Sequence, residues 1–350
     1  MKALLLRRPA PVEQSPLELT EVPTPTPRPG EALVQVSACG ICHTDLHTVE
    51  GDLQLPVLPI IPGHQVVGTV QEIIPRGLPE GDESTCISRP QAGPNQPIVP
   101  GSRVGIPWLS STCGKCRFCR SGRENLCPEA RFTGLHVNGG YAQYAVTRPE
   151  YAVPLPDGLP DCEAAPLLCA GIIGLRALRR ANLPPKGRVG LFGFGASAHV
   201  VLQIARYWGC SVFVFTRSQA HRALATELGA EWVGESSEPP PDRLDAAIIF
   251  APVGDLVKTA LEYLDRGGVV VTAGIHSSPI PMIDYPAIYQ ERTITSVANS
   301  TREDALELIR LGQEIPIRTR IEVYPMEAAN EALRRLRAGR IQGAAVLKIA

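Results

Sequence analysis

The chain has 350 residues, and its 34 basic and 35 acidic side chains nearly cancel. This balance argues against a protein that finds nucleic acid or an anionic membrane through bulk charge, and it favours a small-molecule partner. The length exceeds what one hydrophobic core usually serves, so we expect two domains. The N-terminal apolar run, Ala3 to Leu6, is too short for a signal peptide or a membrane span, and we expect a cytoplasmic protein.

The first region, up to about residue 150, has the pattern of short strands interrupted by Pro and Gly. Segments 31–38 and 64–73 are rich in β-branched residues, as strands are. We therefore predict an irregular β domain. The polar, Pro-rich segment 81–103 is long for a loop in a compact domain, and we interpret it as a surface excursion.

The second region, from about residue 163 to residue 297, alternates strand patterns with helix patterns. The strands are expected at 188–195, 211–216, 245–252 and 267–274, and the helices at 196–209 and 219–230. This alternation predicts a parallel, doubly wound α/β sheet. A further helix pattern at 326–339 and an apolar strand at 344–349 follow, and we expect this tail to return to the first domain.

Four cysteines lie within fifteen positions, separated by two, two and seven residues: Cys113, Cys116, Cys119 and Cys127. Thiolates at such short spacings suit one tetrahedral zinc ion, and the spacing differs from the common ferredoxin patterns of iron–sulfur proteins. Because four thiolates fill the coordination shell, this zinc is predicted to be structural. Zinc ribbons on nucleic acid use similar ligands, but the charge balance argues against that function.

A glycine-rich stretch follows the predicted strand at 188–195. Gly193, Gly195 and Ala198 fit the fingerprint in which amides at the start of a helix hold the pyrophosphate of a dinucleotide. The acid that usually holds the adenosine ribose is absent after the next strand, where Thr216, Arg217 and Ser218 stand instead. A cation and hydroxyls suit a 2′-phosphate, so we predict NADP(H) over NAD(H), with Arg222 assisting.

Two further segments carry thiol, imidazole, hydroxyl and carboxylate groups: ACGICHTDLH at 38–47 and PGHQVVG at 62–68. Together with VGIPWL, the four-cysteine loop, GGYAQY and LCAG, they occur in the order found in one family. The chain closely resembles the zinc-dependent alcohol dehydrogenases of the medium-chain dehydrogenase/reductase family. This resemblance implies a GroES-like catalytic domain at 1–165 and 299–350, a zinc lobe at about 105–130, and a Rossmann-type cofactor domain at 166–298.

The resemblance also implies the roles of individual residues. The ligands of a catalytic zinc would be Cys42, His64 and Cys169, giving two zinc ions per chain. Thr44 and His47 would relay the alcohol proton, and Asp45 would orient His64. His43 matches a family position near the cofactor pyrophosphate, and Trp108 resembles a wall of the substrate pocket. At the far end of the predicted sheet, the segment containing Asn299 is expected to flank the nicotinamide. The family also suggests a dimer or tetramer.

Three positions depart from the family pattern: Gln65 replaces a glutamate, Ile173 a threonine and Ala344 an arginine. The remaining cysteines have no matching role, and we interpret them as incidental thiols: Cys39, Cys86, Cys162 and Cys210. The predicted activity is a zinc alcohol dehydrogenase or aldehyde reductase. Two alternatives stay open, a zinc-independent quinone or enone reductase on the same fold and a non-catalytic protein that binds zinc and nucleotide.

Overall fold

The computed structural model describes residues 1–76 and 97–349. The chain divides into two compact units. Unit 1 comprises Met1–Cys169, Thr301–Arg310 and Arg320–Ala350, and unit 2 comprises Ala170–Ser300 and Leu311–Thr319. The resemblance implies a catalytic domain of 1–165 and 299–350, whereas in the structure 166–169 belong to unit 1 and both 299–300 and 311–319 belong to unit 2. Cys86 and most of the excursion predicted at 81–103 lie outside the described residues.

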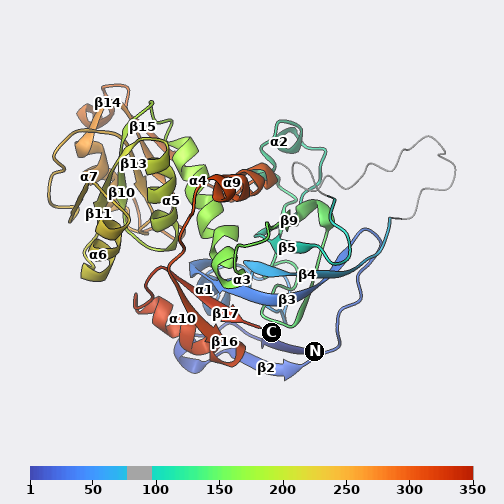
Figure 1. The fold of residues 1–350 in the computed structure, drawn as a ribbon. Coiled ribbons are helices and arrows are strands. Elements are labelled where there is room, and N and C mark those ends of the chain that lie inside the picture. Colours follow the sequence, from blue (N-terminus) through green and yellow to red (C-terminus); the bar gives the residue numbers. More distant parts are fainter. Residues whose placement is uncertain (77–96, 350) are drawn as a thin grey trace, which may run out of the picture. The chain divides into compact units, whose positions relative to one another are not determined.

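Unit 1 is built on a mixed sheet whose strands run in the order β16, β17, β3, β4, β5, β9, with β8 also paired to β3 (Figure 1). The strands of this sheet are β3 (Ala32–Ile41), β4 (Val66–Ile73), β5 (Arg103–Ile106), β8 (Tyr144–Thr147), β9 (Val153–Pro154), β16 (Ile321–Pro325) and β17 (Ala344–Lys348). Val34, Val36 and Val66 are fully buried in its core. This position of the β-branched residues follows from their preference for a pleated, buried surface.

Smaller elements complete unit 1. These are the paired strands β1 (Lys2–Leu6) and β2 (Leu17–Glu21), the pair β6 (Leu109–Ser111) and β7 (Arg131–Phe132), and the helices α1 (His43–Glu50), α2 (Arg117–Arg120), α3 (Asp161–Ala164) and α10 (Ala329–Arg337). Helix α9 (Arg302–Glu314) begins in unit 1 and ends among the residues of unit 2. The sequence analysis predicted neither α1 nor α9.

Unit 2 contains a parallel sheet in the order β12, β11, β10, β13, β14, β15 (Figure 1). Its strands are β10 (Arg188–Phe192), β11 (Ser211–Phe215), β12 (Trp232–Gly234), β13 (Leu244–Ile249), β14 (Leu264–Thr272) and β15 (Thr293–Ser296), and its helices are α4 (Ala170–Arg180), α5 (Ala196–Tyr207), α6 (Gln219–Glu227), α7 (Asp255–Tyr263) and α8 (Tyr285–Ile288). The strand order reverses direction beside β10, as in a doubly wound sheet. Right-handed crossovers then require α5 and α6 on one face and α7 on the other.

The predicted elements of unit 2 all form, with ends shifted by a few residues. The strand predicted at 188–195 ends at Phe192, because the glycines that follow it form the turn into α5. Among residues 1–76 and 97–349, none of the helices has the length and apolar character that crossing a membrane requires.

His199 is a fully buried side chain in the second turn of α5. Its Nδ1 lies 3.2 Å from the carbonyl oxygen of Gly195, so Nδ1 carries the proton and donates it, and its Nε2 has no partner among the described residues. Burial, with a smaller repulsion from His221, lowers the pKa of His199 to about 4. The imidazole is therefore neutral near pH 7.

This buried imidazole should make the stability of unit 2 depend on pH. An unfolded histidine takes up a proton near pH 6.5, whereas folded His199 does so only near pH 4. Between these values the unfolded state binds more protons, so stability falls as the pH falls, by up to about 1.4 kcal/mol per pH unit from this one group. We expect His199→Gln to remove that contribution, which urea unfolding of both proteins from pH 7 to pH 4.5 would measure. Parallel pH profiles for the two proteins would contradict this assignment.

Candidate active site and thiolate cluster

The first thiol of the candidate active site lies at the N-terminus of helix α1. Cys42 is the N-cap residue, and its Sγ accepts the backbone N–H of Thr44 at 3.3 Å. The Asp45 carboxylate accepts the backbone N–H of Cys42 at 2.9 Å, which completes a capping box. Helix N-termini carry partial positive charge and favour a thiolate. The run Cys-His-Thr-Asp thus begins the helix and aims a sulfur from its first turn.

His64 approaches this sulfur from the turn that precedes β4. Gly63 makes the turn with a φ of 94°, a conformation that favours glycine. The His64 Nδ1 lies 3.1 Å from Asp45 Oδ1, and because a carboxylate only accepts, Nδ1 must carry the proton. Nε2 then faces Cys42 Sγ, 3.4 Å away, and in the neutral ring it carries the lone pair that a metal ion would bind. Asp45 therefore fixes both the tautomer and the direction of the imidazole.

Cys169 supplies a third donor from the residue that precedes α4. Its Sγ lies 4.0 Å from the sulfur of Cys42, and the three donor atoms all lie within 4.8 Å of one another. A tetrahedral zinc ion places its sulfur ligands about 3.8 Å apart and a sulfur and a nitrogen about 3.6 Å apart. Cys42, His64 and Cys169 fit such an ion closely and leave one position for a further ligand.

Electrostatics around these donors favour a bound cation. Burial alone would lower the pKa of His64, because it disfavours the charged imidazolium. The negative charges of Asp45 and Cys42 have the larger combined effect and raise this pKa to about 10. The hydrogen bond between the two thiols is the main cause that lowers the pKa of Cys42 and raises that of Cys169. A divalent cation at these donors would take the place of the imidazolium proton in balancing the negative charges of Asp45 and Cys42.

Trp108 lies against this group of donors. Its indole contacts the His64 ring edge to face at 4.9 Å between centroids and stacks on Phe132 at the same distance. The indole is only partly buried. It thus packs beside a candidate metal ligand while part of its surface stays accessible.

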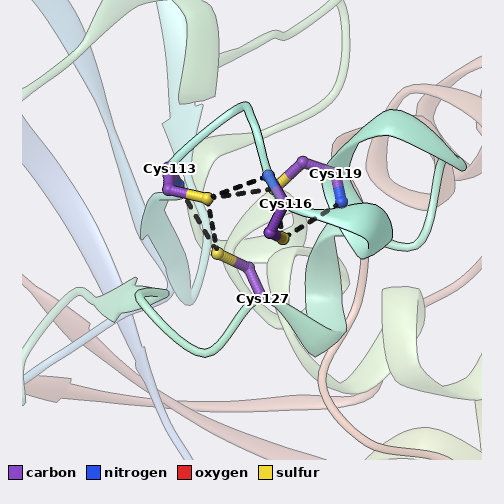
Figure 2. A group of neighbouring side chains, drawn as sticks. All are labelled: Cys113, Cys116, Cys119 and Cys127. Atoms are coloured by element: carbon purple, nitrogen blue, oxygen red, sulfur yellow. Dashed lines mark hydrogen bonds between the residues drawn. The ribbon is translucent and has the colours of Figure 1, made fainter.

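The four-cysteine loop forms the second group of donors, and Figure 2 shows its sulfurs turned toward one another. Neighbouring sulfurs lie 3.5 Å (Cys116 to Cys119), 3.6 Å (Cys127 to Cys113) and 4.0 Å (Cys113 to Cys119) apart, close to the spacing of a tetrahedral site. Backbone amides point at the sulfurs, and the N–H of Cys119 is the main cause that lowers the pKa of Cys116 to about 7. The loop thus fits one zinc ion with a full shell of thiolates.

The comparisons with known proteins agree with this geometry. Residues 28–157 match the family model of the alcohol dehydrogenase GroES-like domain, and residues 198–314 match that of the zinc-binding dehydrogenases. The chain is 48% identical to the probable alcohol dehydrogenase AdhA of Mycobacterium tuberculosis, over 100% of this chain and 97% of that protein. It is 34% identical to an alcohol dehydrogenase of Geobacillus stearothermophilus, over 97% and 98% of the two chains. The chain belongs to the zinc-type alcohol dehydrogenases of the medium-chain family.

Solved structures give the same result for the fold of this alcohol dehydrogenase. A thermostable alcohol dehydrogenase from Pyrobaculum aerophilum, solved with cobalt and zinc bound, matches with a TM-score of 0.85 at 25% identity and covers 100% of this chain and 99% of its own. The predicted fold class, a GroES-like domain with a Rossmann-type parallel sheet, is confirmed. The family resemblance stated from the sequence is confirmed as well.

The glycine-rich turn and the residues predicted to bind the adenosine end of the cofactor lie at the carboxyl edge of the unit 2 sheet, whereas His43 begins α1 in unit 1. Gly193 and Gly195 form the turn between β10 and α5, and the N–H of Gly193 donates to the Phe215 carbonyl at 2.9 Å. Thr216 follows β11, and Ser218 caps α6 by accepting the N–H of His221. The structure thus gathers these predicted residues beside the first crossover of the sheet.

Sequence reasoning missed one residue beside the predicted relay. Helix α1 ends at Glu50 and is capped by Gly51, which has a φ of 86°, and the chain then turns back so that the N–H of Asp52 donates to the His47 carbonyl. The Asp52 carboxylate lies 2.7 Å from Nδ1 of His47. A glycine directly after a helix commonly reverses the chain. The Gly-Asp pair at 51–52 could therefore have indicated that the Asp52 carboxylate returns to the end of α1, where His47 lies.

A second missed residue ties the four-cysteine loop to helix α9. The Glu124 carboxylate, almost buried between Cys119 and Cys127, accepts the backbone N–H of Arg302 at 2.9 Å and two guanidinium nitrogens at 2.7 to 3.1 Å. It therefore caps α9 with a negative charge, which the positive end of the helix dipole favours.

We expect Glu124→Gln to lower the free energy of unfolding by about 1 to 3 kcal/mol, because the charge-assisted bonds to Arg302 become neutral ones. Urea unfolding would measure the loss. Glu129→Gln removes an exposed charge from the same loop and should change little. Equal stabilities for the two variants would show that Glu124 does not anchor the helix.

Proposed function

We propose that this alcohol dehydrogenase is zinc-dependent and transfers a hydride between NADP(H) and a primary alcohol or aldehyde. One zinc ion would bind Cys42, His64 and Cys169, and a second would bind the four-cysteine loop. The observation that carries this proposal is the three-donor group, whose imidazole is held by Asp45 with Nε2 toward the sulfur of Cys42. Three protein ligands with an open fourth position are the pattern of catalytic zinc.

The side chains of α1 would carry the alcohol proton away. Zinc bound at the three donors supplies Lewis acidity toward the substrate oxygen and so favours loss of its proton. Thr44 would accept that proton on its hydroxyl while passing its own to His47, one helical turn further along the same face of α1. Asp52, at 2.7 Å from Nδ1, would stabilise the imidazolium until it releases the proton to solvent.

The other predicted residues take supporting roles in this proposal. Trp108, in contact with His64, would form a wall of the substrate pocket. Gln65 is buried and uncharged, so the site lacks the negative charge that the family's glutamate would bring. Contacts to the cofactor are proposed for His43, Gly193, Gly195, Ala198, Thr216, Arg217, Ser218, Arg222 and Asn299.

The catalytic zinc ligands can be tested by removing one sulfur. We expect Cys42→Ser to lose one of two zinc ions per chain and to lower kcat/KM for a primary alcohol by about a thousandfold or more, because the Lewis acid is lost. Elemental analysis and the rate of nicotinamide reduction give the two readouts.

Cys162→Ser is the matched control, because Cys162 belongs to neither group of metal donors. It should keep both zinc ions and full turnover. A Cys42→Ser protein that has lost one zinc ion but turns over normally would contradict the proposed mechanism and favour a zinc-independent reductase.

The preference for NADP(H) is supported by the residues that follow β11. Arg217 is exposed, and its neighbours Thr216 and Ser218 carry hydroxyls. An arginine presents donors in a geometry that matches a phosphate. Family membership alone does not decide the cofactor, since an acetophenone reductase from Geotrichum candidum, 26% identical, was solved with NAD.

We expect Arg217→Gln to lower kcat/KM for NADP⁺ by about tenfold while changing the value for NAD⁺ little, because only NADP⁺ carries the 2′-phosphate. Steady-state rates at a fixed alcohol concentration would measure both values. Lys258→Gln removes an exposed cation from α7, on the opposite face of the sheet, and serves as the control. A wild-type enzyme with a clear preference for NAD⁺ would refute the proposed cofactor.

We also propose that the chain forms a homo-oligomer. Several large apolar side chains on and beside α8 are exposed, among them Met282 at 89%, Tyr285 at 68% and Tyr289 at 67%. They lie in the segment that leads to β15, which is one of the two edge strands of the unit 2 sheet. Exposed apolar surface beside an unpaired strand edge favours association.

A further inference from the structure

Three chain segments meet at the carboxyl edge of the unit 2 sheet, and one of them brings an acid that the sequence analysis did not consider. The glycine-rich turn follows β10, Thr216 follows β11, and Glu235 follows β12. The N–H of Thr216 donates to the Gly234 carbonyl at 2.8 Å, so Glu235 begins directly beside Thr216. In open α/β sheets, ligands bind outside this edge.

Glu235 is joined to Arg222, the residue predicted to assist a phosphate. The Arg222 Nε–H donates to the carbonyl oxygen of Thr216 at 3.0 Å, and its Nη2 donates to Glu235 Oε1 at 2.9 Å. The guanidinium is therefore held between the ends of β11 and β12, and the carboxylate balances its charge. Both side chains are partly exposed, so the pair can respond to a ligand.

This pairing has opposite consequences for the two nicotinamide dinucleotides. A 2′-phosphate would bring a second negative charge toward Glu235 and would have to compete with it for the donors of Arg222. An adenosine ribose with free hydroxyls brings no such charge. Glu235 therefore acts against NADP(H), whereas Arg217 acts in its favour.

We propose that Glu235 is a specificity-determining residue, which limits the preference for NADP(H) by neutralising Arg222 beside Thr216. The proposal rests on the proposed function in one respect, namely that this edge of the sheet binds the adenosine end of a nicotinamide dinucleotide. It extends that function by assigning the discrimination to two arginines and one opposing acid rather than to Arg217 alone.

The test compares cofactor ratios in single and double variants. We expect Glu235→Gln to raise the ratio of kcat/KM for NADP⁺ to kcat/KM for NAD⁺ by about three- to tenfold, chiefly through a lower KM for NADP⁺, as expected for one charge at a partly exposed site. In the double variant Arg222→Gln with Glu235→Gln, this ratio should lie within about twofold of the wild-type ratio, because one charge of each sign has been removed. The gain should shrink in 1 M salt, where charges are screened within about 3 Å.

Glu231→Gln is the matched control, because Glu231 is an exposed acid that precedes β12 at the opposite end of the same strand. It should leave the cofactor ratio unchanged. Thermal unfolding of each variant, with an unchanged Tm, would show that the fold is kept.

Two results would overturn the inference. An unchanged or lower ratio in Glu235→Gln would mean that the carboxylate does not oppose the phosphate, and an equal gain in the double variant would mean that Arg222 plays no part. The role of Glu235 is tested by the change in the cofactor ratio between variant and wild type, whereas the proposed NADP(H) preference is tested by the wild-type ratio itself. A wild-type preference for NAD⁺ would therefore refute the proposed cofactor and leave the effect of Glu235→Gln as a separate result.

Discussion

The two oxygens of one carboxylate organise the candidate active site. Asp45 accepts the backbone N–H of Cys42 with one oxygen and Nδ1–H of His64 with the other. The first bond completes the cap of α1, and the second fixes the tautomer of an imidazole that approaches from the turn before β4. The carboxylate is almost fully buried, and burial raises its pKa. Helix start, ligand direction and local charge therefore depend on the same side chain.

Features that depend on neighbours in the sequence could be predicted from it. The spacing of the four thiols from Cys113 to Cys127 fits one ion because all four come from a single loop. The alternation of strands and helices in unit 2 gave the parallel sheet, since buried strands and amphipathic helices have different periodicities. Helix α1 was missed because its eight residues contain few apolar ones, and its cap uses a cysteine in place of the usual serine, threonine or aspartate.

Features that depend on tertiary contacts could not be predicted in this way. The chain after β11 contains no acid, whereas Glu235, the acid that pairs with Arg222, follows the neighbouring strand β12. The anchor of α9 joins Glu124 and Arg302, which are 178 residues apart. Neither contact leaves a periodic pattern, because each is set by how separate elements pack. The three donors that the family resemblance named lie together in the structure, although their spacing along the chain shows no such relation.

The turn that presents His64 has a consequence for engineering this enzyme. Gly139 lies so close to the Gly63 carbonyl that a Cβ at position 139 would stand 1.9 Å from that oxygen, and a Cβ at position 63 would stand 2.4 Å from the ring of Tyr141. Both approaches are far inside van der Waals contact. A mutagenesis library aimed at the proposed substrate pocket would waste members at these two positions, and diversity is better placed around Trp108, whose surface is partly accessible.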